Sequence, residues 1–355
     1  MKKLTEMTDR MKEKYAELFI NALNSMEASD WQKPWVSANN GIPCNLYRKN
    51  QPYRGVNHFL LKLLCTLEGW ETPYFVTFNE MTDAEKKFGG LRLTETLKLD
   101  DMGMPEFDKD GMPVVVRPGS FPVFKFLPRF RDKDGNMLSQ YDYEQLTEEE
   151  KQECRTFFKL FNYYVWNIDQ TNFKEVYPEA YEEMTTVQGH EYKQTTLDPV
   201  LEQMIMQGEW RCPIEFGGKS AHYSPSQDHI RLPKRENFLS DELFYGTALH
   251  EMAHSTAMEL KRSQDGSFGS EEYAMEEFVA ELTSACVCSM LGVGKLLDEQ
   301  HLSYVDNWRQ AIRTKDDFIP KVIDQVQRAT NYILRRYEGI AASMQLPKML
   351  GAAAA

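Results

Sequence analysis

Four long stretches with a helical repeat of apolar residues fill the second half of the chain and constrain its fold more than any other feature. They are Leu197–Gln207, Asp241–Leu260, Glu271–Leu291 and Pro320–Tyr337, each with apolar residues at three- and four-residue steps. Ser240 and Ser270 stand where N-caps belong, and Gly292 can end the third helix. Residues 200–350 are therefore predicted to form a mainly helical domain.

The first half mixes shorter helices with strands. Helices are predicted for residues 7–26 and Val56–Leu67, and strands for Tyr74–Phe78, Val114–Val116, Pro122–Leu127 and Tyr163–Ile168. Residues 144–153 form an acidic, exposed insertion, the polar segment 174–199 a connection, and residues 351–355 a tail. We therefore expect an α+β fold of two domains, a mixed α/β domain over residues 1–173 and the mainly helical domain over 200–350.

Charge and hydropathy exclude several classes of protein. A net charge of −13 over 355 residues argues against a protein that coats duplex DNA by charge alone. No apolar run approaches the roughly 18 residues that cross a bilayer, and the N-terminus lacks the apolar segment of a secretory signal. We expect a soluble, cytoplasmic protein with no membrane partner, whose six scattered cysteines are free thiols.

The helix predicted after Ser240 contains a HExxH motif, which starts at His250. Residues four apart share one helical face, so the imidazoles of His250 and His254 can reach one Zn²⁺ ion. Glu251 can then act as the general base toward a water molecule at the metal. The alternative is an ordinary buried helix with two histidines that other side chains satisfy.

A third metal ligand is expected from the next helix. Glu277 lies 23 residues after His254, which leaves room for a chain reversal and an antiparallel return. Acidic side chains on a substantially apolar helix need partners. We therefore predict Glu277 as the ligand and Glu281 as the acceptor that orients a ligating histidine. Glu276 is the second candidate for the ligand, and a solvated acidic stripe is the alternative for the whole helix.

Rings and cations alternate in the first half, which is typical of a surface that stacks the bases of single-stranded DNA. The contacts we predict are Trp35, Arg54 and Asn57, because they lie in loops rich in proline and glycine or at a helix start. The alternative is that most of the rings build the core. No helix-turn-helix or zinc finger is recognisable, which disfavours a reader of duplex sequence.

Several motifs together resemble the ArdC-type antirestriction proteins of conjugative plasmids and related mobile elements. In the second half the matching segments are residues 219–233, 245–256, 273–282 and 304–308. In the first half they are residues 31–35, 41–45, 53–57, 77–78 with 89–90, and 164–171. The resemblance implies an N-terminal single-stranded-DNA-binding domain followed by a zincin-like metallopeptidase domain.

The leading interpretation is a DNA-associated protein with a zinc-dependent peptidase that holds one Zn²⁺ per chain and acts on a protein or peptide. Glu251 is then the general base, and Tyr304 stabilises the oxyanion, with His301 as the alternative donor. A second hypothesis is a DNA-protecting protein that is no enzyme and whose zinc is structural. A metal-dependent nuclease is a weaker third, because two histidines and one carboxylate suit a single zinc better than a pair of metal ions.

Overall fold

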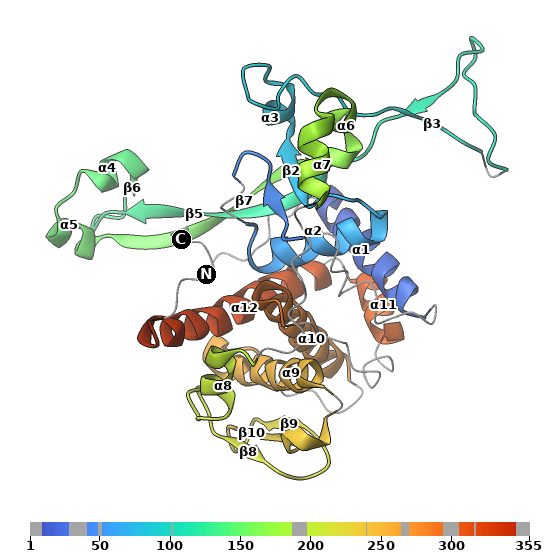
Figure 1. The fold of residues 1–355 in the computed structure, drawn as a ribbon. Helices are drawn as coiled ribbons and strands as arrows, with labels where there is room; N and C mark the ends of the chain where they lie inside the picture. Colours follow the sequence, from blue (N-terminus) through green and yellow to red (C-terminus); the bar gives the residue numbers. More distant parts are fainter. Residues whose placement is uncertain are drawn as a thin grey trace.

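The computed structural model describes residues 9–27, 41–48, 52–100, 102–186, 197–238, 240–263, 270–293, 305–315 and 317–345. The first half contains α1 (Asp9–Glu27), β1 (Cys44–Asn45), α2 (Gly55–Glu68), β2 (Tyr74–Thr77), α3 (Phe78–Thr82), β3 (Thr96–Leu97), β4 (Val115–Val116), β5 (Phe121–Arg131), β6 (Met137–Leu138), α4 (Gln140–Glu144), α5 (Glu148–Glu153), β7 (Arg155–Asn167), α6 (Phe173–Val176) and α7 (Pro178–Thr186). The second half contains α8 (Pro199–Ile205), β8 (Ile214–Phe216), β9 (His222–Ser224), β10 (His229–Leu232), α9 (Asp241–Leu260), α10 (Glu271–Leu291), α11 (Val305–Thr314) and α12 (Phe318–Ser343). This is the predicted α+β architecture, with the sheet-bearing half above the helical half (Figure 1).

A five-stranded sheet organises the first half in the order β1-β2-β7-β5-β6. Only β1 and β2 run parallel, and β5 pairs with β7 along its whole length. Because the hydrogen-bonded ladder continues past the apolar positions, both strands are longer than the predicted Pro122–Leu127 and Tyr163–Ile168. The β5–β7 pair projects from the sheet toward α4 and α5, which carry the exposed acidic insertion (Figure 1).

Three local differences from the sequence prediction have clear causes. Phe78 begins α3 rather than ending β2, because the Thr77 hydroxyl and the Glu80 carboxylate form a capping box. Part of the segment predicted as a connection is helical, and Tyr181 and Met184 of α7 pack into a hydrophobic cluster of the first half. The small sheet β8-β10-β9 was not predicted, since its strands are only three or four residues long.

The two halves meet in one hydrophobic core. Its first-half members come from α1, α2, β2, β5 and β7, and its second-half members from α10, α11 and α12. Phe278 of α10 is the clearest link, because its ring contacts Phe19 of α1 as well as Trp308 and Phe318 of the second half. The helix that carries the predicted third metal ligand is therefore positioned by both halves.

Within the described residues no helix combines the length and apolar character that a membrane span requires. The six cysteines are all free thiols, as predicted.

Candidate metal centre and nucleic-acid interface

The helix α9 buries both histidines of the HExxH motif. Its N-terminus is capped by Ser240, whose hydroxyl accepts a hydrogen bond from the backbone N–H of Leu243 at 3.3 Å. Side chains from Phe244 to Ala257 are buried on nearly every side of the helix, which packs between α10, α12 and the small sheet. Polar groups in such a helix need partners, and α10 supplies them.

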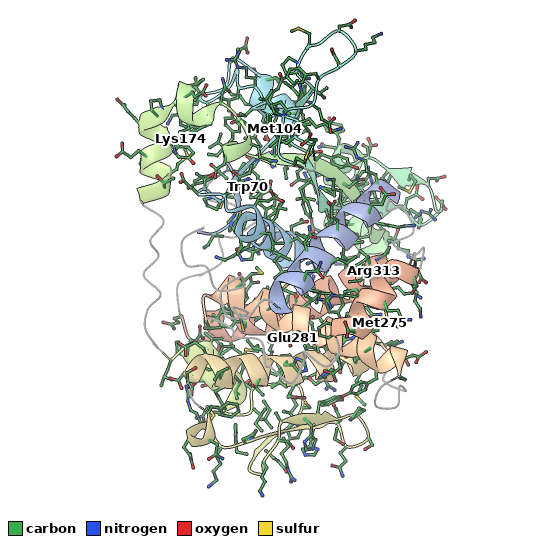
Figure 2. The ribbon with its side chains drawn as sticks, turned by 90° about the vertical axis from the view of Figure 1, so that its right-hand side faces the viewer. Trp70, Met104, Lys174, Met275, Glu281 and Arg313 are labelled. Atoms are coloured by element: carbon green, nitrogen blue, oxygen red, sulfur yellow. The ribbon has the colours of Figure 1, made fainter. Side chains whose placement is uncertain are left out.

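Two glutamates of α10 orient the two imidazoles. The Nδ1–H group of His250 donates to Oε2 of Glu281 at 3.0 Å, and that of His254 donates to Oε1 of Glu276 at 3.2 Å. With both Nδ1 atoms protonated, the two Nε2 atoms present lone pairs to each other across 3.1 Å. Such an arrangement is repulsive unless a cation or a proton lies between the nitrogens. Figure 2 marks Glu281 on α10, beneath the N-terminal helices.

Glu277 completes a set of three donors. Its carboxylate oxygens lie 3.5 Å from Nε2 of His250 and 3.7 Å from Nε2 of His254. All three ligand atoms lie within 4.8 Å of one another. Ligands at zinc-like bond lengths in a tetrahedron are separated by about 3.3 Å, so the donor set fits one such ion. The structure thus brings together the three residues that the sequence predicted as ligands.

Arg262 holds the third glutamate of this region away from the donor set. Its guanidinium group donates to both carboxylate oxygens of Glu276, at 2.7 and 3.1 Å, and to the backbone oxygen of Ala253 at 2.9 Å. Lys261 adopts a left-handed conformation with φ of 53°, which turns the chain back along α9 and delivers Arg262 to this position. Glu276, the second ligand candidate, therefore orients His254 from its Nδ1 side.

The electrostatics of the cluster favour bound positive charge. Burial alone lowers the pKa of His254, but its hydrogen bonds with Glu276 and Glu277 outweigh burial and raise the pKa to about 10. The pKa of His250 is raised for the same reason by Glu277 and Glu281, against the effect of burial. Burial raises the pKa of Glu277, yet the two imidazoles lower it well below the ordinary range. A site that stabilises protons on nitrogen so strongly also suits a divalent cation.

Glu251 is buried next to His250, and within the described residues its carboxylate forms no hydrogen bond or ion pair. A carboxylate that follows a metal-ligand candidate and has no partner of its own is available to accept a proton. Tyr304 and His301, the two predicted oxyanion donors, lie outside the described residues, so their roles stay predictions.

The three predicted DNA contacts have different surroundings. Trp35 lies outside the described residues. Arg54 precedes α2 and lies 3.7 Å from the carboxylate of Glu338 on α12. Asn57 donates to the backbone oxygen of Phe124 at 2.6 Å and accepts from its N–H at 2.8 Å. The Asn57 side chain thus fastens α2 to β5, a structural use that the sequence did not indicate.

The projecting β5–β7 pair carries a row of cations that sequence analysis missed. Opposite residues of an antiparallel pair share a face, so Lys125 lies beside Phe161 and Arg131 beside Arg155. The Arg129 guanidinium lies 5.1 Å from the centre of the Phe161 ring. We call Lys125, Arg129, Arg131 and Arg155 the basic ribbon, which extends about 20 Å along β5. Alternate spacing of basic residues along the strand could have revealed it.

Two family models match separate parts of the chain. The model for the N-terminal domain of the anti-restriction factor ArdC matches residues 9–166, and the model for zincin-like metallopeptidases matches residues 200–323. The chain thus joins an ArdC-type N-terminal domain to a zincin-like metallopeptidase domain.

Solved structures of ArdC share the fold of this chain. The crystal structure of the antirestriction protein ArdC from plasmid R388 in its metal-free form has a TM-score of 0.55 and 22% sequence identity, over 92% of this chain and 98% of that protein. The Mn(II)-bound structure of the same protein has the same TM-score and identity, over 91% of this chain and 97% of that protein.

Two curated relatives match this chain over only part of their own length. The uncharacterized protein y4eC of Sinorhizobium fredii is 33% identical over 122 residues, which are 34% of this chain and 40% of y4eC. The DNA primase TraC of Escherichia coli is 28% identical over 337 residues, which are 90% of this chain and 19% of TraC. The matched regions therefore cover less than half the length of each of these relatives.

Proposed function

We propose that this chain is a DNA-associated antirestriction-type protein of a mobile element with a zinc-dependent peptidase centre. The observation that carries the enzymatic part is the free carboxylate of Glu251 beside a set of three donors. A purely structural zinc site is usually closed by four protein ligands and has no use for such a base. The three donors of the described residues leave a position for water or substrate.

Different residues of the chain have different roles in the proposed peptide hydrolysis. A bound zinc ion would polarise the scissile carbonyl and make water more acidic. Glu251 accepts the proton from the attacking water and passes it to the leaving amine. Glu281 and Glu276 keep the imidazoles turned with Nε2 toward the centre. Tyr304 is the proposed donor to the oxyanion.

One zinc ion per chain is the cofactor that the donor chemistry favours. Two imidazole nitrogens and one carboxylate oxygen form a set known from catalytic zinc sites. Mn(II), the ion in the structure of the similar ArdC protein, prefers more oxygen ligands. Loading the purified protein with equimolar zinc and manganese, followed by elemental analysis, discriminates the two ions.

The Glu251→Gln variant tests the peptidase. It should retain its metal and its melting temperature, yet lose cleavage of an unfolded protein such as casein, followed by mass spectrometry. Glu242→Gln, on the same helix but in its first turn, is the matched control and should cleave normally. Cleavage that survives Glu251→Gln would place the chemistry elsewhere. A metal-loaded wild-type protein that cleaves none of a broad set of peptides would favour the second hypothesis, a DNA-protecting protein with structural zinc.

DNA association rests on the ArdC-type N-terminal domain and on the basic ribbon. Lys125 and Arg155 are exposed, and within the described residues neither has an acidic partner. We propose that Trp35 and Arg54 add a stacking ring and a further cation, that the preferred form is single-stranded DNA, and that the protein acts in the cytoplasm. Fluorescence anisotropy with labelled single- and double-stranded oligonucleotides tests this preference. Equal affinity for both forms would contradict it.

A further inference from the structure

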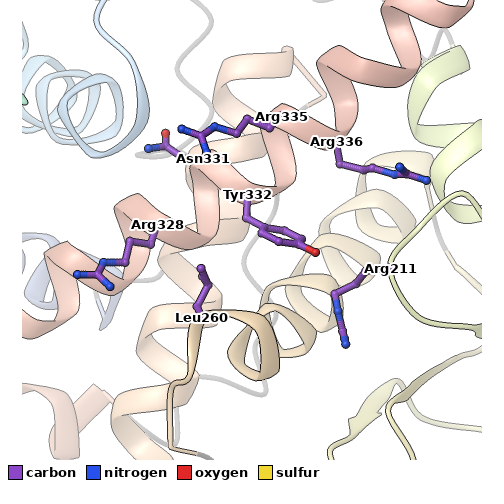
Figure 3. A pocket seen from close by; sticks show the side chains of 7 residues that line it. All are labelled: Arg211, Leu260, Arg328, Asn331, Tyr332, Arg335 and Arg336. Atoms are coloured by element: carbon purple, nitrogen blue, oxygen red, sulfur yellow. The ribbon is translucent and has the colours of Figure 1, made fainter. Parts of the chain in front are cut away.

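A hollow lined with arginines lies where α12 crosses the end of α9. Its volume is about 600 Å³, within the range of small-molecule sites. Arg211, Arg328, Arg335 and Arg336 contribute to its wall, and no lining residue is acidic (Figure 3). The chain as a whole carries a net charge of −13. Four cations around one hollow therefore stand out from an acidic protein.

Three of the four arginines at the hollow have acidic partners, and the fourth has none among the described residues. Arg328 is paired with Asp324 at 3.0 Å and Arg336 with Glu209 at 3.0 Å. Arg335 is exposed and has no hydrogen bond or ion pair with any residue that the structure describes. Exposed pairs of this kind are weak, so a ligand with negative charge can compete for the guanidinium groups.

Arg211 forms a fixed part of the wall. Its side chain is only 9% exposed, and two of its nitrogens bind the carboxylate of Asp228 at 2.6 and 2.7 Å. Its Nε atom is buried without a hydrogen bond, 3.7 Å from the carboxylate of Glu259. With its terminal nitrogens also bound to the Ser255 backbone oxygen and the Met258 sulfur, Arg211 gives the hollow a rigid wall rather than a free donor.

The remaining wall offers a ring, an apolar side chain and an amide. Tyr332 is half-buried, and its ring packs edge-on against Trp210 at 5.9 Å. Leu260 lies across from it (Figure 3). Asn331 accepts a hydrogen bond from Gln327 at 2.9 Å, which leaves its amide hydrogens available. Cations for phosphate, a ring for stacking and an amide for a base edge together suit a nucleotide unit.

The helix α12, which lines the hollow, also contacts the first half near the predicted DNA contact Arg54. Gln327, the partner of Asn331, accepts a hydrogen bond from the backbone N–H of Val56 at 3.0 Å. Arg54, two residues earlier, reaches Glu338 on the same helix α12. A single strand of DNA bound beside Arg54 would therefore reach the hollow if it ran along α12.

We propose that this hollow binds a nucleotide of single-stranded nucleic acid, with Arg328 and Arg335 on the phosphates and Tyr332 against a base. The inference rests on the proposed DNA association and adds a contact that the second half supplies. An acidic peptide shares the charge of this ligand but has no use for the ring.

The test uses the full-length protein and a labelled oligothymidine in anisotropy titrations over a range of salt concentrations. Arg328→Gln combined with Arg335→Gln should weaken binding about five- to tenfold at low salt and reduce the salt slope by about 1.4. Tyr332→Leu should weaken binding about fivefold at every salt concentration. Arg231→Gln combined with Lys234→Gln removes the same charge at the small sheet and is the matched control.

The outcomes separate the hollow from the DNA association itself. If the wild-type protein binds the oligonucleotide and the hollow variants bind it with the same affinity, the hollow is overturned as a binding site while the DNA association stands. No binding of any oligonucleotide by wild-type protein would overturn both. Equal losses of affinity in the hollow variants and in the control variant would mean that binding depends on the overall charge of the protein rather than on a site at the hollow. If the hollow variants lose binding to labelled polyglutamate but still bind oligothymidine like the wild-type protein, the hollow binds acidic peptides and the proposal is overturned.

Discussion

Replacing Phe278 by alanine should destabilise the whole molecule rather than the helical half alone. The side chain is 2% exposed, and its ring lies 4.7 Å from that of Trp308, 5.6 Å from that of Phe19 and 6.0 Å from that of Phe318. Removing a buried ring costs its transfer free energy plus the energy of the cavity that remains. We expect the free energy of unfolding to fall by about 4 kcal/mol.

Urea denaturation followed by both tryptophan fluorescence and circular dichroism measures this effect. The two signals should give one coincident transition in wild-type and variant proteins, because the core includes residues from both halves. Phe278→Leu keeps much of the volume and should cost about 1.5 kcal/mol. A loss below about 1 kcal/mol in Phe278→Ala, or a separate transition confined to the second half, would refute the shared core.

Three further predictions concern the metal, a helix cap and the basic ribbon. Zinc at about a hundred times its dissociation constant should add about 2.7 kcal/mol to the free energy of unfolding, and a thermal-shift assay of His254→Ala should show no such gain. Ser240→Ala should cost about 1 kcal/mol in thermal melts, because the hydroxyl caps α9 through the N–H of Leu243, whereas an unchanged melting temperature would contradict that role. Lys125→Gln combined with Arg155→Gln should reduce the salt slope of oligonucleotide binding by about 1.4, and an unchanged slope would exclude the ribbon.

Local signals made the helices predictable, as well as the cluster of His250, His254 and Glu277. Ser240 and Ser270 mark helix starts by their hydroxyls and Gly292 a helix end by its left-handed backbone, and the structure has α9 and α10 at the predicted bounds. The spacing of His250 and His254 sets their common face, whatever the rest of the fold does. One short interval then limits the places where Glu277 can return.

Features that depend on contacts between distant segments were not predictable. Arg262 reaches Glu276 only because Lys261 takes a left-handed conformation. Asn57 is predicted from the sequence as a DNA contact, and only its contact with the backbone of β5 reveals a structural use. The arginines of the hollow come from two segments that lie far apart in the sequence. No local pattern carries that information.

Metal content of two adjacent variants tests the central claim most directly. Glu276→Gln and Glu277→Gln make the same chemical change at neighbouring positions of α10, and each protein is dialysed against a chelator of moderate affinity before elemental analysis. The account predicts one zinc per chain in wild-type protein, retention with about tenfold weaker affinity in Glu276→Gln, and loss in Glu277→Gln. Equal retention by both variants, or loss in Glu276→Gln alone, would contradict a centre built from His250, His254 and Glu277.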